Sequence, residues 1–407
     1  MTIAMVLLAG TALAAEPDDK FFPITPWEVP WNKGSLLDDA VNGIASLREC
    51  GYTVAAFPTA PQLPECEKAG VHGIVALPGG PIKWHTLSDQ QIAARVQALV
   101  GDTAKSDAVL GYFLKDEPGV EEFPALGKAV AEVKKLAPGK IAYINLYPDY
   151  ATLGAPDISQ LGTASYGEYL ERFVAEVKPQ IISYDNYKIQ FSHDLIDAKQ
   201  AESYFRNLLA VRAVALKHDL PFWNIVSSNR IRPGMPAPSP ANLLVQAYTT
   251  LAAGGKGLTW YTYYDRGYRY APIDKEGHRS RTWGYVKMVN DQVKVIGPIM
   301  KPLKSEGVYF TAPPPAPNAK ALPGKWITAV TSAPAAPAMV GEFSSSAGGK
   351  FAMLVNLSLE RTSYFTIKHA TTGSMQSISP ADGSAGQVEE DTICLPAGQG
   401  VLLELGK

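Results

Sequence analysis

The chain has few cysteines, no histidine motif, no run of basic residues and no long apolar segment after its first fifteen residues. Its cysteines, Cys50, Cys66 and Cys394, have no zinc-site spacing, and its 6 histidines show neither HxH nor HExxH, so we expect no metal or other cofactor. A formal net charge of −2 without basic clusters gives no electrostatic footprint for nucleic acid. No later segment approaches the roughly 20 apolar residues that span a bilayer, so no membrane span is expected.

The first fifteen residues, MTIAMVLLAGTALAA, are apolar and include the sequence ALA at positions 12–14, the small-x-small pattern that signal peptidase cuts. We therefore predict a signal peptide over residues 1–15 and a secreted or periplasmic protein, although the usual positive residues near its start are missing. The alternative is a buried N-terminal helix. An oxidising compartment would also permit a disulfide between Cys50 and Cys66, a pairing that the sequence leaves open.

Segments with strand patterns and helix patterns alternate over the first three quarters of the chain. Strands are expected at 22–31, 52–58, 71–77, 108–116, 141–147, 181–187, 221–229 and 257–264. Helices are expected at 36–49, 62–69, 88–103, 121–136, 166–177, 201–218, 240–253 and 283–300. Eight such units in about 285 residues are the count and size of a (β/α)8 TIM barrel, which we predict over residues 20–304. A doubly wound open α/β sheet is the alternative, but no strand is followed by a GxGxxG turn.

Residues 305–407 have a different texture. Proline- and alanine-rich connectors, APPPAPNAK and SAPAAPA, separate short runs in which polar and apolar residues alternate. SSSAGGKFAMLV is typical of a hairpin because of its Gly-Gly turn, and GQGVLLEL is typical of a closing strand. We therefore predict a smaller, separate all-β domain at the C-terminus, antiparallel and of the β-sandwich type.

The stretch AVLGYFLKDEPG at 108–119 is the most informative one in the chain. Its apolar residues run directly into Lys115, Asp116 and Glu117, after which proline and glycine end the strand. In a TIM barrel the active site lies at the carboxyl ends of the strands, so these two acids are predicted to be catalytic. The alternative is that Asp116 and Glu117 only cap the following helix.

Polar and aromatic residues at the other strand ends would converge on the same mouth. The predicted substrate-binding residues are Trp27, Glu28, Lys115, Asn145, Tyr147, Tyr184, Asn186, Tyr187, Asn229, Trp260 and Tyr261. Amide groups for hydroxyls and flat rings for the C–H faces of a pyranose, next to carboxylates, suit a sugar. Trp260, with Tyr187 or Trp27, is the expected stacking platform. The alternative is that these rings only close the barrel mouth.

Four stretches resemble secreted bacterial (β/α)8 glycoside hydrolases, broadly the β-galactosidase-like clan A: GYFLKDEP, ISYDNY, TWYTYY and VNDQVKVIGPIMKPLKS. KFAMLVNLS and GVLLEL resemble the small β-sandwich that such enzymes carry. The resemblance implies hydrolysis of a glycosidic bond in an oligo- or polysaccharide by two carboxylates, with retention of anomeric configuration. In clan A the acid/base Glu ends strand four after an Asn, and the nucleophile Glu ends strand seven. Here Asp116 stands in place of that Asn, and the seventh strand, PFWNIVSSN, has no acid.

The catalytic carboxylates are therefore expected on strands four and six. Glu117, at the end of an apolar strand and beside Asp116, should have a raised pKa and act as the proton donor. Asp185 should stay ionised and act as nucleophile or base. Alternatively, Asp185 only orients Lys115 or a tyrosine, or an Asp on strand four is the nucleophile and Asp185 the acid/base, as in a different barrel clan. The roles of the three acids stay open, and Glu28 is a further candidate.

Two other functions compete with glycoside hydrolysis. A barrel that binds glycan without cleaving it would be consistent with a seventh strand that lacks an acid. A sugar isomerase or aldolase is disfavoured, because neither a His/Asp cluster nor a Gly-rich phosphate loop follows strands seven and eight. The expected partner is a carbohydrate in each case.

Overall fold

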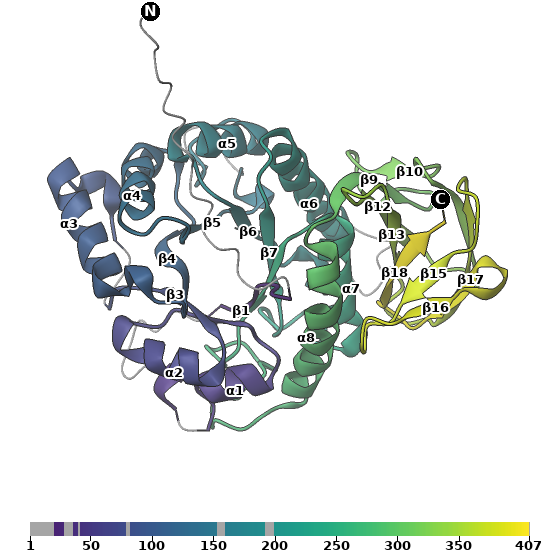
Figure 1. Cartoon of the computed structure of the whole chain (residues 1–407), viewed down its shortest axis with the longest axis horizontal. Helices are drawn as coiled ribbons and strands as arrows, with labels where there is room; N and C mark the ends of the chain where they lie inside the picture. The colour runs from purple at the N-terminus through teal and green to yellow at the C-terminus, as the bar shows by residue number, and fades with distance from the viewer. Residues whose placement is uncertain are drawn as a thin grey trace, which may run out of the picture.

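The computed structural model describes residues 20–27, 36–39, 41–78, 82–152, 159–191 and 199–406. Within them, eight parallel strands form a barrel with helices around it, and two further sheets lie beside the barrel (Figure 1). The prediction of a TIM barrel with a smaller C-terminal β-domain is confirmed. The predicted signal peptide over residues 1–15 and the candidate Glu28 lie outside the described residues.

The barrel strands follow one another around the sheet in sequence order. They are β1 (Ile24–Pro26), β2 (Val54–Ala56), β3 (His72–Val75), β4 (Val109–Asp116), β5 (Ile141–Leu146), β6 (Ile182–Asp185), β7 (Phe222–Ser227) and β8 (Gly257–Tyr261). β1 pairs in parallel with β8, and between β1 and β2 the Thr53 N–H donates to Ile24 O at 3.0 Å. The Thr53 hydroxyl accepts from Ile24 N at 2.8 Å. The barrel therefore closes through the residue that precedes β2.

Helices link the barrel strands and surround them. They are α1 (Ile44–Glu49), α2 (Leu63–Ala69), α3 (Asp89–Val100), α4 (Phe123–Leu136), α5 (Tyr166–Arg172), α6 (Lys199–Lys217), α7 (Pro240–Ala252) and α8 (Arg281–Met300). Ser88 caps α3, and the capping box with Gln91 that the sequence indicates is present. Ser165, Ser239 and Ser280 cap α5, α7 and α8, each accepting a backbone N–H of the first turn. Short hydroxyl side chains thus fix where several of the helices begin.

The two faces of the barrel strands pack against different partners. Side chains that point outward join the helices in the main core, whereas those that point inward fill the barrel. The inward set is aromatic: the ring of Trp27 meets Phe57 edge-to-face with centroids 5.1 Å apart, and Phe57 lies 4.3 Å from Phe113. Tyr143 and Trp223 continue this packing, 5.7 Å apart. The interior is therefore a packed core, and chemistry is confined to the strand ends.

The C-terminal domain consists of two sheets. The larger contains, in spatial order, β10 (Lys320–Ala321), β9 (Lys304–Phe310), β12 (Ala338–Ser344), β13 (Lys350–Asn356), β18 (Gly400–Leu405), β15 (Gln376–Ile378) and β16 (Ala385–Gln387). The smaller contains β11 (Ile327–Ala333), β14 (Ser363–His369) and β17 (Thr392–Leu395). These strands pair in antiparallel fashion, except β9 with β10. The hairpin predicted at the Gly-Gly turn joins β12 to β13, with Gly348 at φ +85°.

The larger sheet packs on the barrel through α7 (Figure 1). Glycine is required at two points of this contact. A Cβ on Gly341 would lie 1.9 Å from Ala252 O, and one on Gly400 would lie 2.3 Å from the ring of Tyr248. Met339 of the sheet belongs to the same buried cluster as the helices of the barrel. The barrel-facing side of the larger sheet therefore joins the core of the barrel, whereas a second buried cluster lies within the β-domain, between its two sheets.

Cys50 and Cys66 are both buried, and each is a free thiol, so the disulfide that the sequence left open is not formed. The Cys50 thiol instead donates to the backbone carbonyl of Trp283 at 3.6 Å. Among the described residues, no helix combines the length and the apolar character needed to cross a bilayer.

Candidate active site

The carboxyl end of β4 is irregular, and this irregularity decides which side chains face the barrel. Phe113 pairs with Tyr143 of β5, but the next pair is Lys115 with Ile144, so Leu114 is an extra residue in the ladder. Such a bulge shifts the in–out alternation of a strand by one residue. The side chains that follow Leu114 therefore point to the face of the sheet opposite to the one that strict in–out alternation would give them.

The bulge turns Lys115 away from the barrel interior and Asp116 toward it. Lys115 forms an ion pair with buried Glu122, with 2.8 Å between Nζ and Oε1. Asp116 pairs with Asn145, whose Nδ2 donates to Asp116 Oδ1 at 3.1 Å. The predicted placement of Lys115 among the substrate ligands is wrong, because its ammonium group is held by Glu122 on the helix side of the strand.

Three contacts hold the bulge and the turn that follows. The indole Nε1 of buried Trp84 donates to Leu114 O at 2.9 Å, which satisfies the carbonyl of the extra residue. The Glu117 N–H donates to Asn145 O at 2.9 Å, and the Tyr169 hydroxyl donates to the carbonyl of the next proline at 2.7 Å. Glu117 adopts φ +45°, a region that non-glycine residues seldom occupy and that is common at functional sites.

A chain of hydrogen bonds runs across β6, β5 and β4 below the carboxylates. Ser183 Oγ donates to Asn145 Oδ1 at 3.2 Å and therefore accepts from the Tyr143 hydroxyl, 2.9 Å away. Asn145 Nδ2 in turn donates to Asp116. Because every donor in the chain points toward Asp116, the chain stabilises this group as a carboxylate.

Asp185 is the last residue of β6, and it is 4% exposed. Its Oδ1 has no hydrogen-bond partner among the described residues. The pKa of Asp185 is raised to about 7, first by burial and then by the charge of Asp116, while hydrogen bonds from Tyr187 and Asn145 act in the opposite direction. A buried carboxylate oxygen without a partner is rare in folded proteins and is consistent with a position that a substrate hydroxyl fills.

Asp116, Glu117 and Asp185 form what we call the carboxylate cluster. The pKa of Glu117 is raised to about 9, first by burial and then by the negative charges of Asp185 and Asp116. The pKa of Asp116 is raised only to about 6, because the hydrogen bond from Asn145 and then the charges of Lys115 and Arg266 counter its burial. The two aspartates therefore release their protons at lower pH than Glu117, so that at neutral pH Glu117 is protonated, Asp116 is mostly ionised and Asp185 is about half ionised.

Tyrosines surround the carboxylate cluster. The rings of Tyr187 and Tyr261 lie 5.0 Å apart at the top of the barrel core. Burial and then the charge of Asp185 raise the pKa of Tyr187, and burial and Glu117 raise that of Tyr147 to about 12. These three predicted residues therefore lie within electrostatic reach of the cluster.

Two other predicted rings are directed away from the mouth, and a third packs among the inward-facing rings of the barrel. Trp260 is 0% exposed on the helix side of β8, where its Nε1 donates to Asn290 Oδ1 of α8 at 2.7 Å. Tyr184 is buried between β6 and the helices, and Trp27 is packed inside the barrel. The predicted stacking role of Trp260 is wrong, because strand alternation directs it outward and directs its neighbour Tyr261 inward.

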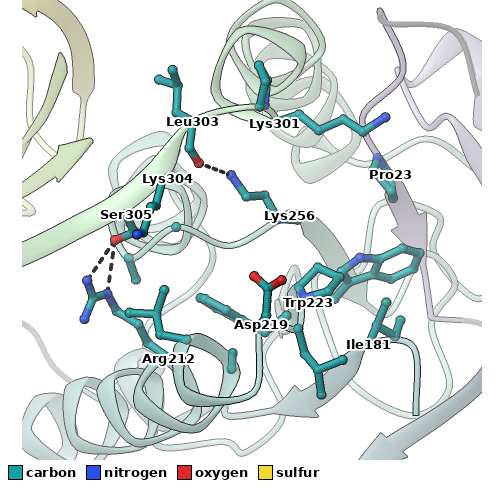
Figure 2. Close-up of a pocket in the computed structure, with 18 of the residues that line it drawn as sticks. Pro23, Ile181, Arg212, Asp219, Trp223, Lys256, Lys301, Leu303, Lys304 and Ser305 are labelled. Atoms are coloured by element: carbon teal, nitrogen blue, oxygen red, sulfur yellow. Dashed lines mark hydrogen bonds between the residues drawn. The ribbon is translucent and has the colours of Figure 1, made fainter. Parts of the chain in front are cut away.

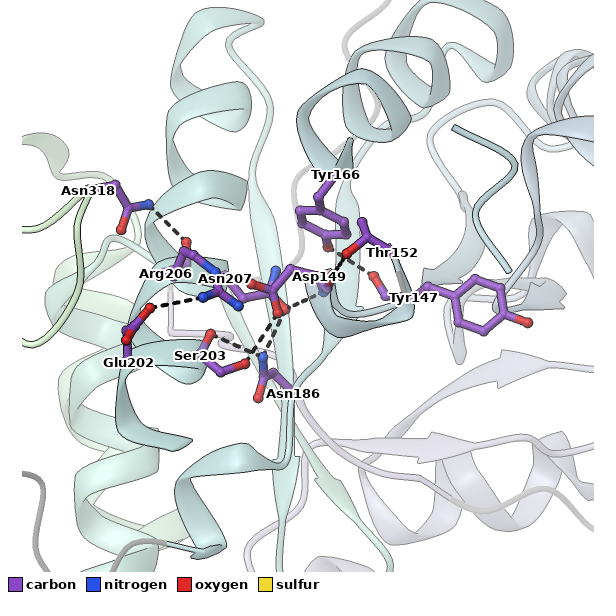
Figure 3. A network of polar contacts seen from close by, with 10 residues as sticks. All are labelled: Tyr147, Asp149, Thr152, Tyr166, Asn186, Glu202, Ser203, Arg206, Asn207 and Asn318. Atoms are coloured by element: carbon purple, nitrogen blue, oxygen red, sulfur yellow. Dashed lines mark hydrogen bonds and ion pairs between the residues drawn. The ribbon is translucent and has the colours of Figure 1, made fainter. Parts of the chain in front are cut away.

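Asn186 and Asn229 are buried, and protein groups occupy their amides. Asn186 Nδ2 donates to Asn207 Oδ1 of α6 at 2.9 Å (Figure 3). Asn229 Nδ2 donates to Thr262 Oγ1 at 3.1 Å, in the loop after β8. Neither amide is directed to the carboxylate cluster, so the structure does not support the predicted contact of these residues with substrate.

The network in Figure 3 fixes the loop after β5 against α6. Buried Asp149 donates its N–H to Asn207 Oδ1 at 3.0 Å and forms an ion pair with Arg206, 2.7 Å from Nε to Oδ2. The Tyr166 hydroxyl donates to Tyr147 O at 2.9 Å, and the phenol of Tyr147 points away from the network (Figure 3). The network thereby positions Tyr147 at the mouth.

Sequence reasoning missed several residues of the site. Tyr143 and Ser183 precede Asn145 and Asp185 by two positions, so strand alternation alone would have placed them on the same inward face. Tyr150 lies in the loop after β5, and its pKa is raised by burial and then by the charge of Asp185. A loop position has no periodicity, so no comparable signal identified it.

The mouth of the barrel offers one proton donor, Glu117, two carboxyl groups that ionise more readily, Asp116 and Asp185, and the phenol groups of the tyrosines beside them. Among the described residues, no group of three or more His, Cys, Asp or Glu side chains is arranged to hold a metal ion. The side chains of the cluster can transfer protons and offer a carboxylate to an electrophilic carbon.

Comparisons with known proteins identify relatives of the fold. No family model matches the sequence, and no curated protein sequence matches it. A catalytic mutant of Gan42B, a family 42 β-galactosidase from G. stearothermophilus, superposes with a TM-score of 0.65 at 8% identity, over 95% of this chain and 98% of that chain. A family 5 glycoside hydrolase from Bacteroides vulgatus superposes with a TM-score of 0.54 at 11% identity, over 95% and 90% of the two chains. The chain therefore shares its fold with glycoside hydrolases.

Proposed function

We propose that this protein is a glycoside hydrolase that cleaves a glycosidic bond in an oligo- or polysaccharide, with Glu117 as the general acid. The observation that carries the proposal is that the carboxyl ends of β4 and β6 bring three acids, one of them fully enclosed, to the same edge of the barrel, where their protonation differs. Glu117 keeps its proton to a pKa of about 9 while Asp185 and Asp116 ionise at about 7 and 6. An acid held neutral next to an ionised carboxylate is the arrangement that glycosidases require.

Each member of the cluster has a role in this proposal. Glu117 protonates the glycosidic oxygen of the leaving group. Asp185, in its ionised form and with an Oδ1 that no described residue hydrogen-bonds, acts as nucleophile or as the base that activates water. Asp116 is held as a carboxylate by Asn145, so it keeps the proton on Glu117 and accepts a hydrogen bond from a sugar hydroxyl.

Tyr187 and Tyr261 take the place of Trp260 as the sugar platform. Their rings are partly buried at the top of the barrel core and lie next to Asp185. A pyranose bound on these rings would have its anomeric carbon over the cluster. The fold that the chain shares with glycoside hydrolases supports a carbohydrate substrate without identifying the sugar.

A second candidate function, glycan binding without cleavage, is favoured by the end of β7. Ser227, Ser228 and Asn229 are all buried there, and Ser228 Oγ donates to Thr262 O at 2.9 Å. The strand that carries the nucleophile in the resembling clan therefore ends in a closed hydroxyl and amide network. If Asp185 cannot replace that nucleophile, the barrel binds glycan only.

An activity screen on aryl glycosides and on plant and bacterial polysaccharides separates the two candidates. Hydrolysis that is lost in Glu117→Gln supports the enzyme. Binding of a glycan with equal affinity to the native protein and to Glu117→Gln, without product, supports the binding barrel.

A further inference from the structure

A second cavity lies at the end of the barrel opposite to the carboxylate cluster. Its volume is about 730 Å³, within the range of small-molecule sites (Figure 2). Leu110, Ile141, Ile181 and Trp223 stand at or near the starts of their strands and form its inner wall. Ile181 precedes Asp185 by four residues, so roughly 13 Å of strand separates the two sites at about 3.3 Å per residue.

The outer wall of this cavity is the connection from α8 to the β-domain. Lys301, Leu303, Lys304 and Ser305 belong to it, and in Figure 2 the carbonyl of Leu303 is directed to Lys256 and the hydroxyl of Ser305 to Arg212. The cavity is therefore enclosed by barrel strand starts on one side and by the segment that enters β9 on the other. It shares no residue with the carboxylate cluster.

Two cations of the wall, Lys256 and Arg212, have no carboxylate partner among the residues that the structure describes. Lys256 Nζ donates to Met300 O and Leu303 O, both at 2.8 Å. Arg212 Nε and Nη2 donate to Ser305 Oγ at 3.2 and 2.8 Å (Figure 2). Among the described residues, no acid lies within ion-pair distance of either group, so both cations are balanced only by neutral oxygens.

Burial makes this arrangement unfavourable for the cations in the empty cavity. It lowers the pKa of Lys256 to about 8 and that of Arg212 below its usual value. No negative charge counters the shift at Lys256, and only the phenol of Tyr309 does so at Arg212. Half-buried charges without counter-ions are costly, and an anion between them would relieve that cost.

The rest of the wall defines the form of the anion. The inner surface is apolar and aromatic, and the cations Arg212 and Lys256 share the wall with one acid, Asp219. Figure 2 shows the Asp219 side chain directed into the cavity. A ligand with an apolar body and a single anionic group would satisfy the cations and keep its body against Trp223, whereas a second anionic group would meet Asp219.

We propose that this cavity is a binding site for a small carboxylate with an apolar body, independent of the proposed hydrolase function. Octanoate is a suitable probe, and 1-octanol is its neutral counterpart. In titration calorimetry of the full chain, octanoate should bind at least tenfold more tightly than 1-octanol, because only the carboxylate can pair with Arg212 and Lys256.

Variants test the two cations and the acid separately. Arg212→Met and Lys256→Met should each weaken octanoate binding at least tenfold and leave 1-octanol binding unchanged. Lys217→Met is the matched control, because Lys217 is exposed on the same helix as Arg212 and does not line the cavity. Asp219→Asn should tighten octanoate binding severalfold, and Asn is compatible with its backbone at φ +52°.

Asp219→Asn also covers the possibility that the methionine variants fail to fold, because Asp219 is exposed. The proposal is overturned if 1-octanol binds as tightly as octanoate, if octanoate does not bind at millimolar concentration, or if folded Arg212→Met and Lys256→Met bind it like the native protein. Unchanged octanoate affinity in Asp219→Asn would overturn it as well.

Discussion

The substitution Glu117→Gln should abolish general acid catalysis while keeping the shape of the site. In water a glutamic acid with its ordinary pKa of 4.5 would be about 0.3% protonated at pH 7, whereas with a pKa of about 9 it is about 99% protonated. The site therefore raises the fraction of usable acid about 300-fold. A glutamine cannot supply the proton, so kcat should fall by about 10²–10⁴, or about 2.7–5.4 kcal/mol.

The pH profile of kcat/KM identifies which group was removed. Glu117 acts when protonated, so activity should fall as the pH rises through about 9, and Asp185 acts when ionised, so activity should fall as the pH drops through about 7. Glu117→Gln should lose the alkaline limb and keep the acidic one. Asp185→Asn should lose the acidic limb and, by removing a negative charge, move the pKa of Glu117 downward.

The assay uses aryl glycosides whose leaving groups differ in acidity. A 2,4-dinitrophenyl glycoside needs little protonation, so Glu117→Gln should lose far less rate with it than with a 4-methylphenyl glycoside. Glu121→Gln serves as the control for a nearby loss of charge, because Glu121 is exposed four residues further along the chain. Full kcat in Glu117→Gln on a verified substrate, or equal losses for both leaving groups, would refute the assignment of Glu117 as the acid.

Three further predictions concern binding, stability and processing. Tyr261→Ala should raise KM about 2- to 13-fold, equivalent to a loss of about 0.5–1.5 kcal/mol of binding free energy. Trp260→Ala should leave KM unchanged and lower the free energy of unfolding by about 3–5 kcal/mol. The reverse pattern in steady-state kinetics and denaturant melts would contradict the structure. The raised pKa of Glu117 makes the folded state less stable as the pH rises from the unfolded-state pKa of 4.5 to about 9. Glu117→Gln should therefore stabilise the protein at pH 7 by about 0.5–2 kcal/mol and have no such effect at pH 4. Thermal melts at both pH values will test this. We also propose export, so mass spectrometry of the native protein should find its N-terminus near Ala15 or Glu16, and an intact Met1 would count against it.

The sequence was sufficient for the fold because each strand and helix carries its own periodic signal. Each barrel strand lies within its predicted range, and the capping box at Ser88 is where the pattern placed it. These features depend on residues that are neighbours in the chain. The barrel closure at Thr53 and the contact of Gly341 with α7 depend on residues far apart, and no local pattern encodes them.

The site was less predictable because facing depends on the register of neighbouring strands. The residues at a strand end include both helix-facing and barrel-facing side chains. Selecting them together combined the helix-facing Trp260 and Tyr184 with the barrel-facing Tyr261 and Asp185. Alternation along each strand separates these pairs, but at β4 even alternation fails. The extra residue Leu114 is visible only in the pairing of β4 with β5.

The last prediction is the stereochemistry of the reaction, which follows from the strands that carry the acids. Asp116 pairs with Asn145 of β5, which in turn pairs with Ser183 of β6. Glu117 is one residue beyond Asp116 and Asp185 is two residues beyond Ser183. Asp185 therefore lies two strands away from Glu117 and one residue nearer the mouth. With strands about 4.8 Å apart and about 3.3 Å per residue, their Cα atoms are roughly 10 Å apart.

Side chains that reach inward from that distance can bring the two carboxyl groups to about 5–5.5 Å, the separation of retaining enzymes. We therefore expect retention, as in the resembling clans. Proton NMR of the first-formed product should give the anomer of the substrate, and a 2-deoxy-2-fluoro glycoside should label the peptide that contains Asp185. An inverted first product without a label would instead make Asp185 the base that activates water.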